Sequence, residues 1–144
     1  MKKIISIAVV AATLTLALAG CSGGYKNGTY KAEAAEYSHD WKDYVIVSVS
    51  GGDVTIQEYD SLNAAGEKKS EDAEYREAME PVSGTYPGKY FPDIIAEYEA
   101  KGSVDKMDSI TGATNSTDSF KALVTAALEN AKKGDTATAT VPVE

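Results

Sequence analysis

The residues best suited to chemistry gather in one short segment, Asp108–Phe120 (DSITGATNSTDSF). Small hydroxyl residues surround a Gly-Ala pair there, and an apolar run with helical spacing follows directly. Gly112 permits a backbone conformation or a close approach that a side chain would block. The first turn of the following helix offers unpaired amide N–H groups and a partial positive charge, which together can hold a phosphate. The segment therefore predicts an anion site beside Thr114.

The same residues also have a simpler interpretation as helix caps. Ser116 and Thr117 stand where the helix is expected to begin, and Ser and Thr side chains commonly accept a hydrogen bond from a free N–H there. Because capped helices are much commoner than phosphate sites, the residue types alone leave both interpretations open.

The rest of the composition excludes several kinds of chemistry. Cys21 is the only cysteine and His39 the only histidine. One cysteine forms no disulfide within the chain, no Cys-x-x-Cys redox pair and no iron–sulfur site. One histidine cannot build a His-rich zinc site, and no nucleophile-elbow pattern accompanies it. Its neighbours Ser38, Asp40 and Trp41 indicate a surface loop. Redox chemistry here would need a bound organic cofactor.

The charge and the length bound the choice of partners. The chain has 144 residues, a length that suits one domain with a core of its own. Its net charge is −8. An acidic chain without a basic, aromatic-interleaved patch is a poor partner for nucleic acid. We therefore expect no nucleic-acid binding.

The N-terminus predicts export. Two lysines precede Ile4–Ala19, a run without charge that is too short to span a bilayer and suits a secretory signal. The sequence Leu18-Ala19-Gly20-Cys21 resembles the processing site of bacterial lipoproteins. That resemblance implies a signal peptide at 1–20, diacylglycerol on Cys21, a short tether over 21–26, and a membrane-anchored domain on the extracytoplasmic face. The alternative is an ordinary signal peptide with an incidental cysteine.

Period-two patterns predict strands in the first half of the mature chain. One pattern includes Tyr30, Ala32 and Ala34. A stronger one includes Val45, Val47 and Val49, and a β-branched run follows it after Gly51-Gly52, which is typical of a hairpin.

Three helices are expected in the second half. The first covers 71–80, with Ser70 as its cap and Pro81 as its stop. The second covers 92–101, between Pro92 and Gly102. The third begins near Ser116 or Thr117 and ends at Gly134. Residues 135–144 read as a flexible tail. Strands first and helices after them favour an α+β fold, with a small antiparallel sheet packed against about three helices.

The opening segment also resembles a known family. Asp108-Ser109-Ile110-Thr111-Gly112-Ala113-Thr114, followed by Asn115-Ser116-Thr117, is similar to the flavinylation signature Asp-x-x-(Ser/Thr)-Gly-Ala-Thr of FMN-binding domains. Such domains occur in the C subunit of sodium-translocating NADH:quinone reductase, in the G subunit of the Rnf complex, and as small secreted lipoproteins. The resemblance implies one domain over 27–134. Asn27 departs from the family pattern, in which Asp is frequent there.

The resemblance implies a cofactor and a role for each signature residue. FMN would be joined by a phosphoester to the hydroxyl of Thr114 by a Mg²⁺-dependent flavin transferase that takes FMN from FAD. Asp108 would serve recognition by the transferase or metal positioning. Thr111, Gly112 and Ala113 would shape the turn. Ser116 and Thr117 lie at the helix start that would hold the phosphate.

Nine tyrosines in a small domain suggest aromatic contacts to the flavin. Tyr86 and Tyr90 are the candidates, with Lys89 beside a flavin oxygen or the phosphate. The alternative is that these tyrosines are ordinary half-buried residues.

A membrane-anchored electron carrier is the function that these features favour. FMN would supply the redox chemistry, and the sequence has no set of residues typical of catalysis on one particular substrate. The proposed carrier would accept electrons from a membrane quinol or another flavoprotein. Two alternatives remain: a non-redox surface lipoprotein or antigen, and a substrate-specific flavin reductase.

Overall fold

The computed structural model describes residues 24–143. The expected signal peptide and the expected lipidation site Cys21 lie outside the described residues. Within the described range, none of the helices is both long and apolar enough to cross a membrane.

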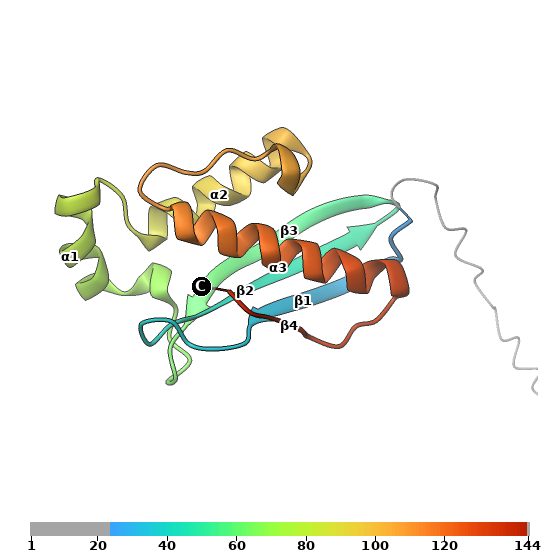
Figure 1. The fold of residues 1–144 in the computed structure, drawn as a ribbon, viewed down its shortest axis with the longest axis horizontal. Coiled ribbons are helices and arrows are strands. Elements are labelled where there is room, and N and C mark those ends of the chain that lie inside the picture. Colours follow the sequence, from blue (N-terminus) through green and yellow to red (C-terminus); the bar gives the residue numbers. More distant parts are fainter. Residues whose placement is uncertain (1–23, 144) are drawn as a thin grey trace, which may run out of the picture.

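A four-stranded sheet forms one layer of the domain (Figure 1). Its strands are β1 (Gly28–Ala34), β2 (Lys42–Ser50), β3 (Asp53–Leu62) and β4 (Ala139–Val141), in the spatial order β3-β2-β1-β4. The first three pair antiparallel, as expected, whereas β4 pairs parallel to β1. The sheet is therefore mixed, which corrects the all-antiparallel expectation.

The predicted alternation decides which face of the sheet is buried. Tyr30, Ala32 and Ala34 of β1 and Val45, Val47 and Val49 of β2 are all buried. The Gly51-Gly52 hairpin joins β2 to β3, and both glycines have positive φ (59° and 88°). Positive φ at both central residues suits the right-handed twist of the paired strands.

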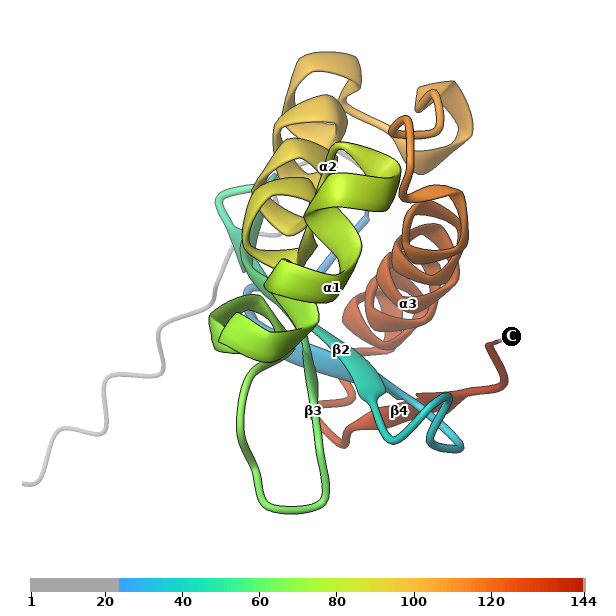
Figure 2. The same cartoon turned by 90° about the vertical axis from the view of Figure 1, so that its left-hand side faces the viewer.

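Three helices cover the sheet or extend from its end: α1 (Ala73–Ser83), α2 (Pro87–Lys101) and α3 (Thr114–Lys133). Two single 3₁₀ turns, Lys69–Glu71 and Val104–Lys106, precede α1 and follow α2. Figure 2 shows α2 and α3 side by side above the strands, with α1 at the near end of the molecule. The α+β expectation is confirmed.

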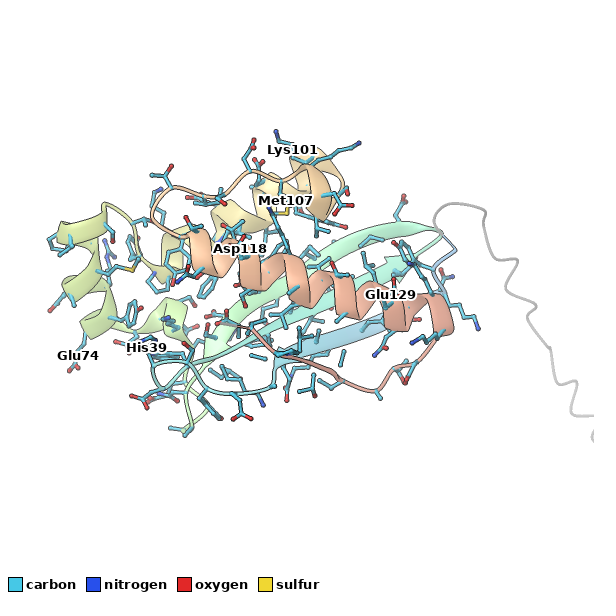
Figure 3. All side chains as sticks on the ribbon, viewed as in Figure 1. His39, Glu74, Lys101, Met107, Asp118 and Glu129 are labelled. Carbon is cyan, nitrogen blue, oxygen red and sulfur yellow. The ribbon has the colours of Figure 1, made fainter. Side chains whose placement is uncertain are left out.

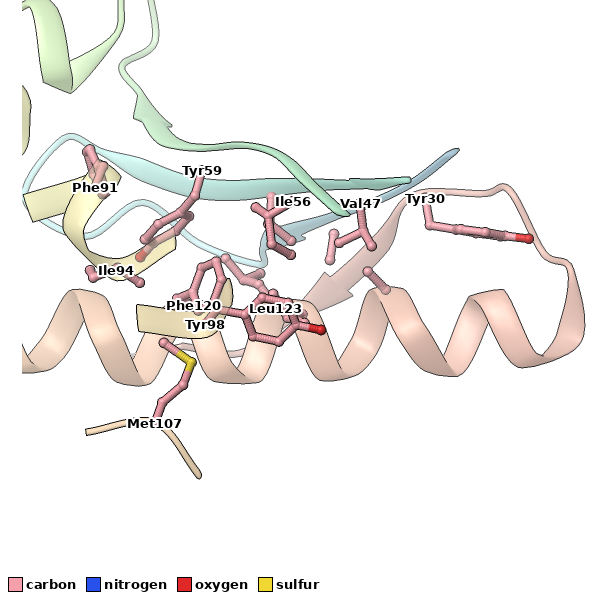
Figure 4. Close-up of a cluster of buried hydrophobic side chains, with 14 of the residues drawn as sticks. Tyr30, Val47, Ile56, Tyr59, Phe91, Ile94, Tyr98, Met107, Phe120 and Leu123 are labelled. Atoms are coloured by element: carbon pink, nitrogen blue, oxygen red, sulfur yellow. The ribbon is translucent and has the colours of Figure 1, made fainter. Parts of the chain in front are cut away.

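The core lies between the sheet and the apolar faces of α2 and α3 (Figure 4). Phe120, Leu123 and Val124 of α3 have no exposed area, as the helical spacing predicted. Tyr59 of β3 packs edge to face on Phe91 and on Phe120, with ring centres 4.8 and 5.0 Å apart. These aromatic contacts attach both helices to one strand.

The first expected helix differs from the observed one at both ends. Asp72 caps α1 in place of Ser70, and its carboxylate accepts a hydrogen bond from the amide of Tyr75 at 2.9 Å. Pro81 lies inside the last turn and the helix ends at Gly84, which has the left-handed conformation. No residue of α1 is fully buried. Solvent on most sides leaves room for the proline ring in the last turn, where few helical bonds remain to be lost.

The other two helices begin earlier than expected. Pro87, and not Pro92, takes the first position of α2, so this helix begins at residue 87 and not at the expected residue 92. The third helix begins at Thr114, two or three residues before the expected start. The predicted ends at Gly102 and Gly134 are both confirmed by left-handed glycines.

The expected flexible tail also differs. Residues Ala139–Val141 form β4 on the free edge of β1, and the amide of Ala35 donates to the carbonyl of Val141 at 2.7 Å. Low complexity predicted mobility, but the alternating Thr and Ala residues fit an edge strand once a partner edge is available.

Candidate functional site

A cavity of about 750 Å³ is lined by residues from the start of α3, from α1 and from the loop before β2. Its volume lies within the range of small-molecule and cofactor sites, about 300 to 1,000 Å³. The residues that line it are Ala34, Glu36, Ser38, His39, Trp41, Asp43, Lys69, Tyr75, Met79, Tyr90, Gly112, Ala113, Thr114, Asn115, Ser116 and Val143. A second hollow, of about 630 Å³, lies around Tyr25 and Tyr98 and includes none of the signature residues.

The signature turn requires glycine at position 112. Gly112 has φ 79°, a conformation that costs other residues free energy. A Cβ there would lie 2.8 Å from Cγ2 of Thr85 and 3.3 Å from the carbonyl oxygen of Ser83. The loop between α1 and α2 therefore packs directly against the turn, and a side chain at 112 would separate them.

The side chain of Thr117 stabilises the signature turn by hydrogen bonds and does not cap α3. It is fully buried, and its Oγ1 donates to the carbonyl of Ala113 at 2.8 Å. The same oxygen accepts from the amide of Ile110 at 3.1 Å. One side chain thereby joins the two ends of the turn to the first turn of α3.

The N-terminus of α3 is open toward the cavity. Its first helical hydrogen bond runs from the amide of Thr117 to the carbonyl of Ala113 at 2.9 Å, so the amides of Thr114, Asn115 and Ser116 have no partner within the helix. Within residues 24–143, no side chain caps this end. The capping interpretation is therefore not supported. The amides and the positive end of the helix dipole remain available to an anion.

An aromatic wall faces the start of α3. Trp41 and Tyr75 meet edge to face, with ring centres 6.3 Å apart and an interplanar angle of 87°. The ammonium of Lys69 lies 4.5 Å from the centre of the Tyr75 ring and 5.8 Å from that of Trp41. Tyr90, which is only 2% exposed, completes this wall. Aromatic side chains on one wall of a cavity, with polar groups on the other walls, suit an aromatic cofactor that carries a phosphate.

A two-residue turn brings His39 to the cavity. Ser38 and Trp41 exchange backbone hydrogen bonds of 2.7 and 3.0 Å, and both His39 and Asp40 between them have positive φ (50° and 70°). His and Asp tolerate this conformation better than most residues. Figure 3 shows His39 at the same end of the molecule as Glu74 of α1, far from Glu129 near the other end of α3.

Asp43 of β2 joins the cavity floor to α3. The hydroxyl of Ser119 donates to its carboxylate at 2.6 Å, and the hydroxyl of Ser61 donates to the other carboxylate oxygen. The phenol of Tyr59 lies 3.3 Å from the same carboxylate and donates to the carbonyl of Ser116 at 2.6 Å. Burial, aided by the negative charge of Asp43, raises the pKa of Tyr59 well above its ordinary value. Tyr59 therefore remains a donor at physiological pH.

The structure gathers half of the residues chosen from the sequence. Those that line the cavity are Gly112, Ala113, Thr114, Ser116 and Tyr90. Thr111 and Thr117 lie next to them in the turn. Asp108, Tyr86 and Lys89 are not among its lining residues.

Each of the three outlying residues has a contact elsewhere. The Asp108 side chain is 84% exposed and lies 3.2 Å from the ammonium of Lys101. The ring of Tyr86 lies 4.2 Å from the guanidinium of Arg76. Lys89 pairs with Asp93 one turn along α2 at 3.1 Å. The expected contacts of Tyr86 and Lys89 with the flavin therefore have no support from this geometry.

Several cavity residues were missed by the reading of the sequence. Asp43, Lys69 and Met79 come from three different elements and belong to no local motif. A lone tryptophan beside the only histidine was a weak signal for Trp41. Only the folded chain brings these residues together.

The fold and the cavity define a small α+β domain with a candidate cofactor site at the start of α3. The family model of the FMN-binding domain matches residues 37–129, and the chain belongs to that family. FMN is its cofactor.

Two similar proteins match this chain over most of its length. The chain is 36% identical over 124 residues to a 15 kDa lipoprotein of Treponema pallidum (strain Nichols), covering 85% of this chain and 88% of that protein. The crystal structure of the CPE2226 protein from Clostridium perfringens superposes with a TM-score of 0.74 at 36% identity. That match covers 83% of this chain and 99% of the other.

The residues present fit FMN. The free amides at the start of α3 can bind a phosphate, and the wall formed by Trp41, Tyr75 and Tyr90 can take a planar ring system. FMN supplies the redox chemistry when it is bound, whereas the chain supplies position, charge and protection from water.

Proposed function

We propose that this chain is a lipid-anchored flavoprotein that carries electrons outside the cytoplasm, with FMN joined through its phosphate to the hydroxyl of Thr114. The observation that supports this most is the position of Thr114. It is exposed, it is the first residue of α3, and it lies on the cavity wall beside the free amides of that helix.

The attachment is a transfer of FMN from FAD. The hydroxyl oxygen of Thr114 forms a bond to the phosphorus on the FMN side of the pyrophosphate, the P–O–P bridge breaks, AMP leaves, and the hydroxyl proton passes to solvent or base. A flavin transferase with Mg²⁺ would perform this step. The exposure of Asp108, three residues before the turn, suits recognition by that enzyme.

The anchor rests on the Cys21 motif. The relative from Treponema pallidum is named a lipoprotein, which supports the same assignment here. Diacylglycerol adds two acyl chains, which hold a small domain stably, whereas a single chain is marginal.

Electron transfer is favoured over the reduction of one particular substrate because of the residues at the cavity. His39 is exposed, and its Nδ1 lies 3.2 Å from the hydroxyl of the adjacent Ser38. Among the described residues, no carboxylate lies within hydrogen-bond distance of the His39 ring to orient it, and Asp43 is held by the hydroxyls of Ser61 and Ser119, so no nucleophile–base–acid triad is assembled. The proposed donor is a membrane quinol or a flavoprotein. A substrate-specific reductase would instead show one acceptor that reoxidises the flavin much faster than generic acceptors do.

Intact-mass analysis of the exported domain tests the attachment. With an active flavin transferase, the mass should rise by FMN less one water, on the peptide that includes Thr114. Thr114→Val should abolish the gain, while Thr114→Ser should retain part of it because the hydroxyl remains. Thr125→Val is the matched control, since Thr125 is exposed on the same helix and its hydroxyl donates only to the carbonyl of Lys121 at 2.7 Å.

The results separate the three functions. Covalent FMN on Thr114→Val protein would refute the attachment site. A wild-type protein without flavin under any co-expression would favour a non-redox surface lipoprotein. A loaded protein that exchanges electrons at similar rates with several acceptors would support the carrier.

A further inference from the structure

Asp43 places a carboxylate on the wall of the flavin cavity without a cation to balance it. Glu36, His39 and Lys69 are the other charged or titratable side chains on that wall besides the tyrosines. Among residues 24–143, no lysine, arginine or histidine nitrogen lies within ion-pair distance of the Asp43 carboxylate. Hydrogen bonds from serine hydroxyls stabilise this carboxylate.

Those hydroxyls fix the direction of the carboxylate. Ser61 of β3 donates to one oxygen, and Ser119 of α3 donates to the other at 2.6 Å. Tyr59 lies 3.3 Å from the second oxygen. The two serine donors come from different elements and hold both oxygens of the Asp43 carboxylate, whereas the side chain of Glu36 is exposed.

The position of Asp43 relative to the attachment site is also fixed. Ser119 belongs to the second turn of α3, and Tyr59 holds the carbonyl of Ser116 in the first turn at 2.6 Å. Thr114, Ser116 and Asp43 therefore face one cavity from elements that are tied together.

We propose that Asp43 is a positioning residue of fixed negative charge that lowers the reduction potential of the FMN bound in this cavity. Reduction adds two electrons and one proton to the flavin and so leaves one extra negative charge on its ring. A nearby carboxylate opposes that charge, and partial burial weakens the screening by solvent. The inference rests on the binding of FMN in this cavity. It does not depend on the covalent bond or on the identity of the redox partner.

The test is the midpoint potential of the FMN-loaded protein, measured by titration with dithionite against reference dyes. Asp43→Asn removes the charge and keeps the shape, and the serine hydroxyls can turn to accept from its amide. We expect the two-electron midpoint to rise by about 30 mV or more, which is a tenfold change in the equilibrium constant.

Two matched variants separate charge from structure. Glu36→Gln removes a charge of the same sign from an exposed position on the same wall, so its smaller shift should vanish at high salt, whereas that of Asp43→Asn should persist. Ser119→Ala keeps the charge and removes one tie to α3, and it should cause no upward shift. Urea unfolding of the three flavin-free variants reports any loss of fold.

Each outcome decides the inference. An unchanged or lower midpoint in Asp43→Asn would overturn it. An equal upward shift in Ser119→Ala would assign the effect to the structure and not to the charge, which also overturns it. A wild-type protein that binds no flavin, even without the covalent bond, would overturn both this inference and the proposed function. If FMN is bound but not covalently attached, and the midpoint potential still rises in Asp43→Asn as expected, the inference stands and only the covalent attachment is refuted.

Discussion

At the scale of the residue, the signature turn combines chemistry and packing in few atoms. Gly112 allows the loop between α1 and α2 to approach, and Thr117 ties the turn to α3 through two hydrogen bonds. Thr114, between them, has no packing task and is exposed. The small residues around Thr114 leave its hydroxyl accessible to another enzyme.

Gly112→Ala should destabilise the domain and reduce flavin attachment. The left-handed conformation costs alanine about 1 to 2 kcal/mol, and the contact with Thr85 adds about 1 to 3 kcal/mol because neither neighbour can move freely. The measurement is the free energy of unfolding in urea, together with the fraction of protein that carries FMN.

Gly66→Ala is the matched control for this prediction. Gly66 has a similar φ of 82°, but a Cβ there meets nothing within 4 Å. It should show only the conformational cost and full attachment. Equal losses in the two variants would mean that the close approach of Thr85 has no energetic effect.

At the scale of the element, the last residues of the described chain cover an edge that would otherwise be free. The strand β4 pairs with the last three residues of β1, and Val143 after it reaches the cavity. An uncovered β1 edge would offer unpaired backbone groups to other chains. The tail therefore covers part of the β1 edge and also borders the cavity.

Truncation after Gly134 should cost about 1 to 3 kcal/mol of unfolding free energy, because a few edge hydrogen bonds are lost at about 1 kcal/mol each. The truncated protein should also associate at high concentration. Urea unfolding and sedimentation measure the two effects. Thr140→Ala, which changes an exposed side chain on β4 and keeps the backbone pairing, should resemble the wild type. A truncated protein as stable and as monomeric as the wild type would show that β4 contributes nothing.

At the scale of the whole molecule, α3 separates the cavity from the start of the domain. The amide of Lys26 donates to the carbonyl of Ala131 near the far end of α3, and the helix of 20 residues is about 30 Å long. The first described residues therefore lie near the end of α3 that is opposite to the cavity.

Buried tyrosines should make the domain sensitive to alkali. Burial raises the pKa of Tyr59, Tyr90 and Tyr98 above the ordinary value of 10.0. The unfolded chain loses these protons first, so the free energy of unfolding is constant below about pH 10 and falls as the pH rises toward the higher pKa values of the folded state. Each such group contributes a slope of up to about 1.4 kcal/mol per pH unit.

Tyr59→Phe tests this dependence. It should lower the free energy of unfolding at pH 7 by about 1 kcal/mol, because the carbonyl of Ser116 loses its hydrogen bond from the phenol, and it should make the alkaline slope shallower. Urea unfolding between pH 8 and pH 11 gives both quantities. An unchanged slope would mean that Tyr59 ionises without unfolding.

Local sequence patterns predicted most of the strands and helices. Alternating valines defined the buried face of β2, the glycine pair defined the hairpin, and the helical spacing from Phe120 to Ala131 defined α3. The signature around Thr114 was equally local, because a turn and a helix start need only neighbouring residues. Such features follow from the period of the backbone and the φ that each residue tolerates.

Only the tertiary structure decided which residues complete the cavity and which strand covers the edge of β1. Asp43, Lys69 and Tyr75 line the same cavity as Thr114 because β2, the turn before α1 and α1 itself lie at one end of α3. Residues Tyr86 and Lys89 lie closer in sequence to Thr114 than these three and do not line the cavity. The pairing of β4 with β1 likewise depends on an edge about a hundred residues away. The reason is physical: contacts across long separations depend on the packing of whole elements, which no local pattern encodes.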